Sequence, residues 1–215
     1  GLGKAGVTGA IKHFCGNNQE THRHDIDSII SERALREIYL KGFEIAVKEG
    51  PATTVMTTYG SVNGTYTSGR YDLNTSILRG EWGFNGFVMT DWWANISEKG
   101  KPVDKKNFAA MIRAQNDVYM VTPDGAVNSA GDNIIASLEA GTLKRSELQR
   151  NAANVLGFLL HTPAYLRIIG TPVEIEVTGR PADEDSVDLD NLVFHEVGHD
   201  TYIDLEDVDT SKGKS

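Results

Sequence analysis

Polar and aromatic residues follow each of four short apolar runs in the chain, and together they can build a binding site. Their types suit carbohydrate, because charged donors bind hydroxyl groups, a carboxylate can attack or stabilise an anomeric carbon, and indole rings stack on sugar C–H surfaces. In α/β barrels the reacting groups also sit where strands end and loops begin. The four groups are Lys12-His13, Met56 to Tyr59, Asp91-Trp92-Trp93 and Pro123-Asp124.

These residues also have a purely structural interpretation. Lys12 and His13 can be ordinary loop residues, and Asp91 can cap a turn, since polar residues are common at strand ends. Residue type and spacing alone therefore leave both interpretations open.

The elements that would position these groups alternate between strands and helices. The clearest helix is Ser31–Glu49, where apolar residues recur at i, i+3, i+4, i+7, i+8 and i+11, and Gly50-Pro51 ends it. Weaker helices are predicted at Tyr71–Gly80, Lys105–Ala114, Asn133–Ala140 and Arg145–His161. The apolar runs predict buried strands at Val7–Phe14, Thr53–Tyr59, Gly86–Asp91 and Asp117–Val121.

This alternation predicts an α/β fold with a parallel sheet for residues 1–161. Four βα units make half of an eight-unit (β/α)8 TIM-like barrel, which would leave two edge strands unpaired. From Pro163 the character changes, and residues 162–215 are predicted to form a β-rich extension. Its small antiparallel element would run from Thr171 to Leu205, with a hairpin turn at Gly198-His199-Asp200.

Composition excludes several classes of partner. The formal charge of −9 argues against nucleic acid, because phosphate binding needs a basic face, and no apolar run is long enough to cross a membrane. Cys15 is the single cysteine, so no intrachain disulfide can form. The first residues carry neither an initiating Met nor a signal-peptide pattern, so a cytoplasmic location is slightly favoured and the gene's start stays open. No cofactor and no metal are expected.

Four segments together resemble glycoside hydrolase family 3. They are IKHFCGNNQE (11–20), SERALREIYLKGFEIAVKEG (31–50), VMTTYGSVNG (55–64) and LRGEWGFNGFVMTDWWA (78–94). Their order and spacing also match, over residues 1 to about 160. The family's nucleophile segment is usually Ser-Asp-Trp, where this chain has Thr90-Asp91-Trp92.

The resemblance implies a role for several of the strand-end residues. Asp91 would be the nucleophile that forms a covalent glycosyl intermediate, and the hydroxyl of Tyr59 would help to hold it. Lys12 and His13 would hydrogen-bond sugar hydroxyls.

Met56 would line the pocket, although a simple core role suits it nearly as well, and Trp92 would form a wall toward the leaving group. Trp93 has no counterpart in the family pattern and is interpreted as packing, and Cys15 as a small buried hydrophobe.

The loop from Cys15 to Glu20 resembles the β-glucosidase branch, because it lacks the His that the N-acetylglucosaminidase branch uses as its acid/base. The substrate would be a β-glucoside or oligosaccharide. The chain would then be the second half of the barrel, without the first half and without the domain that supplies the acid/base Glu. We expect it to be inactive alone, and its exposed barrel edges to seek the missing half or a second copy.

Two other functions stay open. One is a non-catalytic carbohydrate-binding fragment, against which the intact Asp91 argues. The other is a zinc peptidase through His195-Glu196-x-x-His199, which matches a short zinc motif. That chemistry needs a helix, whereas the flanking residues Leu192-Val193-Phe194 and Thr201-Tyr202-Ile203 favour strands around a turn.

Overall fold

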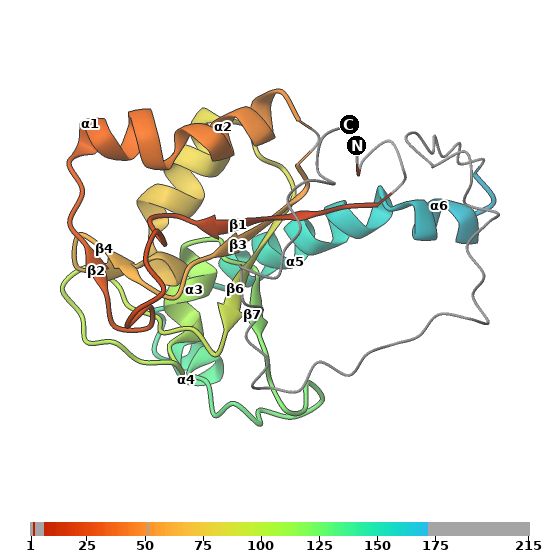
Figure 1. Ribbon diagram of the computed structural model, residues 1–215. Coiled ribbons are helices and arrows are strands. Elements are labelled where there is room, and N and C mark those ends of the chain that lie inside the picture. Colours follow the sequence, from red (N-terminus) through yellow and green to blue (C-terminus); the bar gives the residue numbers. More distant parts are fainter. Residues whose placement is uncertain (1, 3–6, 51, 172–215) are drawn as a thin grey trace, which may run out of the picture. The chain divides into compact units, whose positions relative to one another are not determined.

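The computed structural model describes residues 2, 7–50 and 52–171. Its centre is a parallel sheet with strand order β1-β3-β6-β7 (Figure 1). The strands are β1 (Ala10–Phe14), β3 (Thr54–Thr57), β6 (Phe87–Trp92) and β7 (Val118–Met120). The four predicted parallel strands are therefore confirmed. The predicted antiparallel element and the His195–His199 motif lie outside the described residues.

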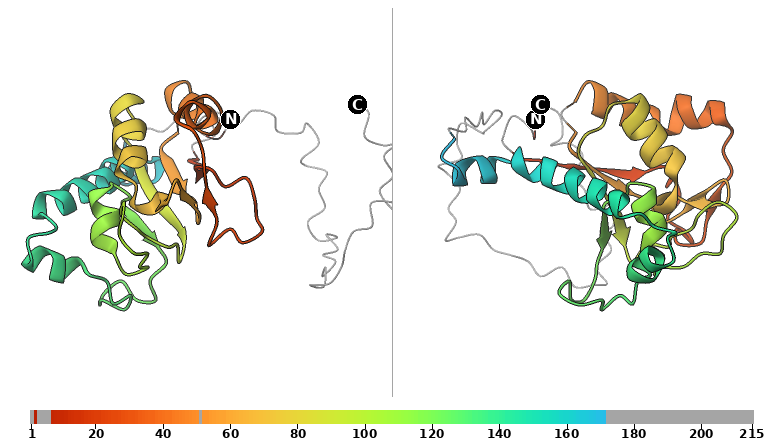
Figure 2. Two further views of the ribbon diagram at one scale, coloured as in Figure 1. Left: turned by 90° about the vertical axis from the view of Figure 1, so that its left-hand side faces the viewer. Right: turned by 180° about the vertical axis from the view of Figure 1, so that it is seen from behind.

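Helices separate the strands along the chain (Figure 2). The predicted Ser31–Glu49 helix is present as three consecutive pieces, and Ser31 caps it by accepting the Ala34 N–H at 3.3 Å. The other four predicted helices are also found, with shorter or shifted ends. The three pieces of the first helix are α1 (Glu32–Ala34), the π-helical η1 (Leu35–Tyr39) and α2 (Lys41–Lys48). The other four helices are η3 (Asp72–Glu81), α3 (Phe108–Arg113), α4 (Ile134–Glu139) and α5 (Arg145–Leu160).

A further helix, α6 (Pro163–Ile168), lies at the start of the stretch for which the sequence predicts a β-rich extension. Thr162 caps it by accepting the Tyr165 N–H at 3.3 Å, and Pro163 occupies the first turn, where its missing N–H costs nothing. A Thr-Pro pair followed by apolar residues was the available signal. No helix in the described stretches is long and apolar enough to cross a bilayer.

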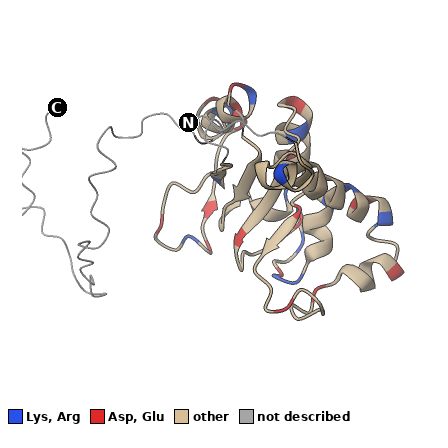
Figure 3. Cartoon of the chain, turned by 90° about the vertical axis from the view of Figure 1, so that its right-hand side faces the viewer, with Lys and Arg blue, Asp and Glu red and all other residues tan. Residues whose placement is uncertain are grey.

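The helices cover one face of the sheet with the main apolar core. Val55 and Val88 are paired in register, and both pack among helix residues such as Leu35 and Ile77. Charged residues fall mostly on helices and loops rather than on these strands (Figure 3). Burial of the apolar face fixes which side chains of each strand point to the core. Because the four strands are parallel, their carboxyl ends lie on the same side of the sheet.

A second, small sheet was also not predicted. It joins β2 (Asp27–Ser28), β4 (Ser61–Val62) and β5 (Thr65–Tyr66), and the short helix η2 (Thr67–Gly69) follows it. The Asn63 side chain accepts the Ile30 N–H at 2.9 Å and donates to the Ile30 carbonyl at 2.8 Å. These bonds fasten the loop after β1 to the loop after β3.

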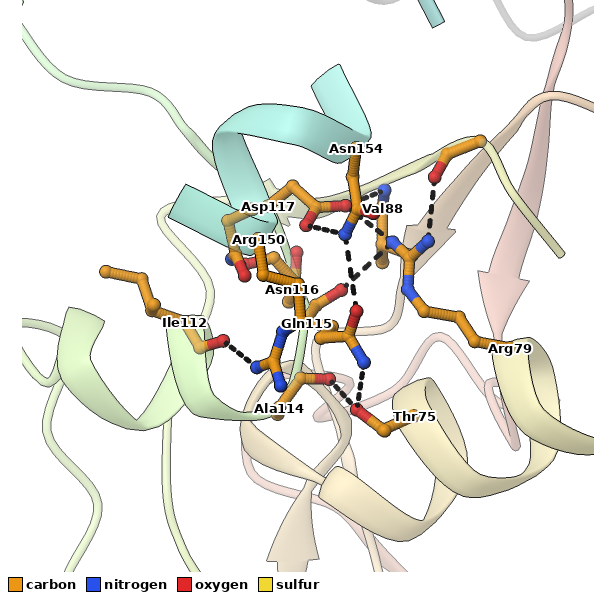
Figure 4. Close-up of polar contacts among 12 residues, drawn as sticks. Thr75, Arg79, Val88, Ile112, Ala114, Gln115, Asn116, Asp117, Arg150 and Asn154 are labelled. Atoms are coloured by element: carbon orange, nitrogen blue, oxygen red, sulfur yellow. Dashed lines mark hydrogen bonds and ion pairs between the residues drawn. The ribbon is translucent and has the colours of Figure 1, made fainter. Parts of the chain in front are cut away.

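A buried polar network lies at the opposite, amino-terminal end of β6 and β7 (Figure 4). The Asp117 side chain is fully buried and accepts three hydrogen bonds, from Arg79 at 2.6 Å, the Val88 N–H at 2.9 Å and Asn154 at 2.8 Å. Arg79 also donates to the Gly86 carbonyl at 2.9 Å. The network joins η3, β6, β7 and α5.

Candidate active site

His13 and Asp91 meet at the carboxyl ends of β1 and β6, which flank β3 in the sheet. His13 Nε2 lies 3.3 Å from Asp91 Oδ2, and the two side chains are 22% and 9% exposed. They are 78 residues apart in sequence, so only the parallel order of the strands brings them together. A carboxylate and an imidazole at hydrogen-bond reach on a strand edge form a reactive pair open to solvent on one side.

The backbone around Asp91 holds its carboxylate in place. Asp91 Oδ1 accepts the N–H of Trp92 at 2.8 Å. Thr90, fully buried, accepts the Met120 N–H at 2.8 Å and so ties the end of β6 to β7. Trp93 has a positive φ of 52°, which turns the chain away immediately after the strand. Asp91 is therefore the penultimate residue of a strand whose end is anchored to β7.

Tyr59, two residues after β3, lies between aromatic and charged neighbours. Its ring centroid is 4.0 Å from that of His24, and the Arg23 guanidinium is 4.9 Å from it. The pKa of Tyr59 is raised, first by burial and then by the charge of Asp91 and a hydrogen bond to it. The phenol therefore keeps its proton and can donate it toward the Asp91 carboxylate.

His13 is biased toward its neutral form. Burial lowers its pKa, and the charge of Asp91 opposes that effect without reversing it. Lys12 also lowers the pKa of His13, and Glu20 raises it. On the far side of the ring, Asn17 Nδ2 lies 3.5 Å from His13 Nδ1.

The other predicted site residues lie around this pair in different ways. Met56 is 5% exposed and is paired in register with Met89. Trp92 is 39% exposed, which suits a wall at the rim. Lys12 is exposed and lines a groove between the β1 edge and the helix residues Ile38 to Ala46, and its side chain makes no hydrogen bond or ion pair within the described chain.

Trp93 corrects the sequence analysis, which assigned it to packing. It is 56% exposed, although the next residue, Ala94, is fully buried. Cys15 is fully buried, and burial raises the pKa of its thiol to about 12, so it is an inert core residue as predicted.

Sequence reasoning missed three residues of the loop between β1 and β2: Asn17, Arg23 and His24. Each contacts His13 or Tyr59. The available signal was the density of polar and cationic residues directly after Lys12-His13. A cavity of about 930 Å³ lies elsewhere, between the amino ends of β1 and β3 and the Phe158 end of α5, and it includes none of the reactive residues.

Comparisons with known proteins agree on one family. Residues 1–158 match the model of the glycosyl hydrolase family 3 N-terminal domain. The chain is 57% identical over 212 residues to a beta-glucosidase of Ruminococcus albus, covering 99% of this chain and 22% of that one. Over 159 residues it is 40% identical to beta-glucosidase B of Emericella nidulans, covering 74% and 17%.

Solved structures give the same result. A beta-glucosidase from Paenibacillus barengoltzii is 57% identical with a TM-score of 0.72, covering 75% of this chain and 18% of that chain. Beta-glucosidase 3B from Thermotoga neapolitana in complex with glucose is 41% identical with a TM-score of 0.65, covering 75% and 22%. The chain thus spans about a fifth of the length of these relatives.

Proposed function

The chain belongs to glycosyl hydrolase family 3, and we propose that it supplies the nucleophile of a retaining β-glucosidase, with Asp91 in that role. The observation that carries the proposal is the pairing of Asp91 with His13 at 3.3 Å, on a strand end where a sugar can approach. The names of the relatives supply the substrate class, a β-glucoside.

In the proposed reaction an Asp91 carboxylate oxygen attacks the anomeric carbon and forms a glycosyl ester. The glycosidic C–O bond breaks, and its oxygen takes a proton from an acid carboxyl supplied from outside the described residues. Water then attacks the same carbon, gives its proton to that carboxyl in its base form, and releases the sugar. Asp91 leaves this second step as a carboxylate again.

Neighbouring side chains assist in this scheme. The donor groups of His13 and Tyr59 hold the Asp91 carboxylate before attack. Lys12 and His13 bind hydroxyls of the glucosyl unit, Met56 lines its pocket, and Trp92 forms the wall toward the leaving group. These roles come from the family resemblance and agree with the burial of Met56 and the partial exposure of Trp92.

A retaining glycosidase needs two carboxyl groups about 5–5.5 Å apart. We therefore propose that the active protein contains the remaining barrel half and an acid/base domain, and that these 215 residues alone do not hydrolyse β-glucosides. The β1 edge is unpaired within the described chain, and beside it Ile38 and Ile45 of the helix are 69% and 44% exposed. Either the missing half or a second copy would cover this surface, and sedimentation of the isolated chain distinguishes a dimer from a monomer.

The decisive experiment is Asp91→Asn in a turnover-competent enzyme that contains this chain. We expect aryl β-glucoside turnover to fall on the order of 10⁴-fold, because the amide cannot form the ester. Glu139→Gln is the matched control, since Glu139 is exposed on α4 and is not among the strand-end candidates.

Labelling with a slow 2-fluoro glucoside gives a second, independent measurement. Mass spectrometry should place the covalent sugar on the peptide that carries Asp91 and find none in Asp91→Asn. A label on another carboxylate, or near-normal turnover by Asp91→Asn, would refute the assignment.

A further inference from the structure

The loop after β1 carries three polar side chains that contact one another in series, and the first of them contacts His13. Asn17, four residues beyond His13, places Nδ2 at 3.5 Å from His13 Nδ1 and at 3.3 Å from Glu20 Oε1. Glu20 in turn accepts from Arg23 Nη1 at 2.8 Å. The loop therefore holds Asn17 between a carboxylate and the imidazole.

The Glu20 carboxylate settles which way the Asn17 amide points. An ionised carboxylate can only accept hydrogen bonds, and Arg23 Nη1 holds Glu20 Oε2 at 2.8 Å. A flipped amide would put Asn17 Oδ1 against Glu20 Oε1, which would set two acceptors face to face. The NH2 group of Asn17 therefore faces both Glu20 and His13.

A donor against Nδ1 fixes the position of the imidazole proton. Nδ1 must accept from Asn17, so neutral His13 carries its proton on Nε2. Protonated Nε2 is the ring atom that lies 3.3 Å from Asp91 Oδ2, so an N–H group rather than a lone pair meets the carboxylate. The opposite tautomer would set a lone pair against Asp91.

Arg23 of the same loop also contacts Tyr59. The Arg23 guanidinium that holds Glu20 also lies 4.9 Å from the centre of the Tyr59 ring, and burial together with the charge of Asp91 raises the pKa of Tyr59. One loop therefore contacts both side chains that neighbour Asp91: Asn17 contacts His13, and Arg23 contacts Tyr59.

We infer that Asn17, held by Glu20, is a positioning residue that fixes His13 as the Nε2–H tautomer and so orients the Asp91 carboxylate. The catalytic consequence rests on the proposed function of Asp91, whereas the tautomer itself does not. Asn17 touches neither Asp91 nor the site where a sugar would react, so it acts through His13.

The test reads the tautomer directly, by nitrogen NMR of the chain labelled with ¹⁵N-histidine, over a pH series that reaches the neutral form. His13→Gln assigns the His13 signals. We expect Nε2 protonated and Nδ1 unprotonated in the unmodified chain. Because the Asp91 carboxylate also favours Nε2–H, the variants are compared in an Asp91→Ala background, where Asn17→Asp should move the proton to Nδ1 and Asn17→Ala should give a mixture of tautomers.

Asn18→Asp is the matched control, because Asn18 is exposed and the variant carries the same charge change one residue away. It should leave the His13 signals in the Nε2–H pattern. If Asn17→Asp loses its dispersed amide spectrum, Asn17→Ala decides the matter, since it removes the donor without adding charge. An Nδ1–H tautomer in the unmodified chain, or Nε2–H retained in Asn17→Ala in the Asp91→Ala background, would overturn the inference.

Kinetics separate this inference from the proposed function. In a turnover-competent enzyme containing this chain, Asn17→Ala should lower kcat about 10- to 100-fold with a smaller change in KM, the usual effect of losing an orienting partner. If the tautomer changes as expected but Asp91→Asn stays active, the nucleophile assignment fails and the positioning of His13 stands. If Asp91→Asn is inactive and the tautomer does not respond to Asn17, the nucleophile assignment stands and the positioning role of Asn17 fails.

Discussion

Two buried aspartates on neighbouring strands have opposite surroundings. Asp117, at the amino end of β7, is fully buried, paired with Arg79, and bonded to Asn154 and a backbone N–H (Figure 4). Asp91, at the carboxyl end of β6, keeps 9% of its side chain exposed; it accepts one backbone N–H, and His13 Nε2 lies 3.3 Å from its Oδ2. The second neighbouring side chain is Tyr59, whose pKa is raised by burial and by the charge of Asp91.

The difference separates a stabilising group from a reactive one. Burial raises the pKa of Asp117 and lowers that of Arg79, so each charge is costly by itself and depends on its partner. The neighbours of Asp91 are a neutral imidazole and a phenol, which orient a carboxylate without neutralising it. In a barrel, the amino ends of the strands serve stability and the carboxyl ends serve chemistry.

The largest expected effect on stability comes from Asp117→Asn. It leaves the Arg79 guanidinium buried without its counter-charge and should lower the free energy of unfolding by about 3–5 kcal/mol. Urea unfolding of the isolated chain measures this. Asp91→Asn is the matched change at the other end of the sheet and should cost less than about 1 kcal/mol, because no buried cation loses its partner.

A double variant sharpens that result. Arg79→Met combined with Asp117→Asn removes both charges, and it should be more stable than Asp117→Asn alone. A double variant that is the less stable of the two would show that hydrogen bonds of Arg79 to the Gly86 and Gln115 carbonyls matter more than its charge.

A smaller loss is expected for Asn154→Ala on α5. It removes the 2.8 Å hydrogen bond to Asp117 Oδ1 and should cost about 2 kcal/mol, as is usual for a bond to a charged group. Gln149→Ala on the same helix is the control, since Gln149 is exposed and its replacement should change stability by less than about 0.5 kcal/mol. If Asn154→Ala is as stable as Gln149→Ala, the hydrogen bond to Asp117 contributes nothing measurable to stability.

The smallest expected effect is a pH dependence from His13. Its pKa in the folded chain is lowered, chiefly by burial, below the ordinary value of 6.5. The folded state then binds fewer protons than the unfolded state between these two pKa values, so stability rises with pH across that window and falls as pH drops below about 6.5. Urea unfolding at several pH values, with His13→Gln as the reference, isolates this contribution. A His13→Gln variant with the same slope would assign the dependence to other groups.

The sequence by itself determined the strands, their parallel order and the residues at their ends. Buried strands are continuous apolar runs, and helices carry an apolar stripe, so both are visible in short windows. His13, Tyr59 and Asp91 could therefore be placed on one edge, because parallel strands end on the same side of a sheet. The four motif segments added the family and with it the proposed roles.

Only the tertiary structure decided which polar groups meet. Asp117 appeared in the sequence merely as the first residue of a strand, because its partners Arg79 and Asn154 lie 38 and 37 residues away. In the sequence, Asn17, Arg23 and His24 look like residues of an ordinary polar loop. In the structure, the small β2-β4-β5 sheet holds that loop close to Tyr59. Local patterns record burial and periodicity, whereas hydrogen bonds and ion pairs depend on the three-dimensional approach of distant segments, and that approach gives Asp91 and Asp117 their different chemistry.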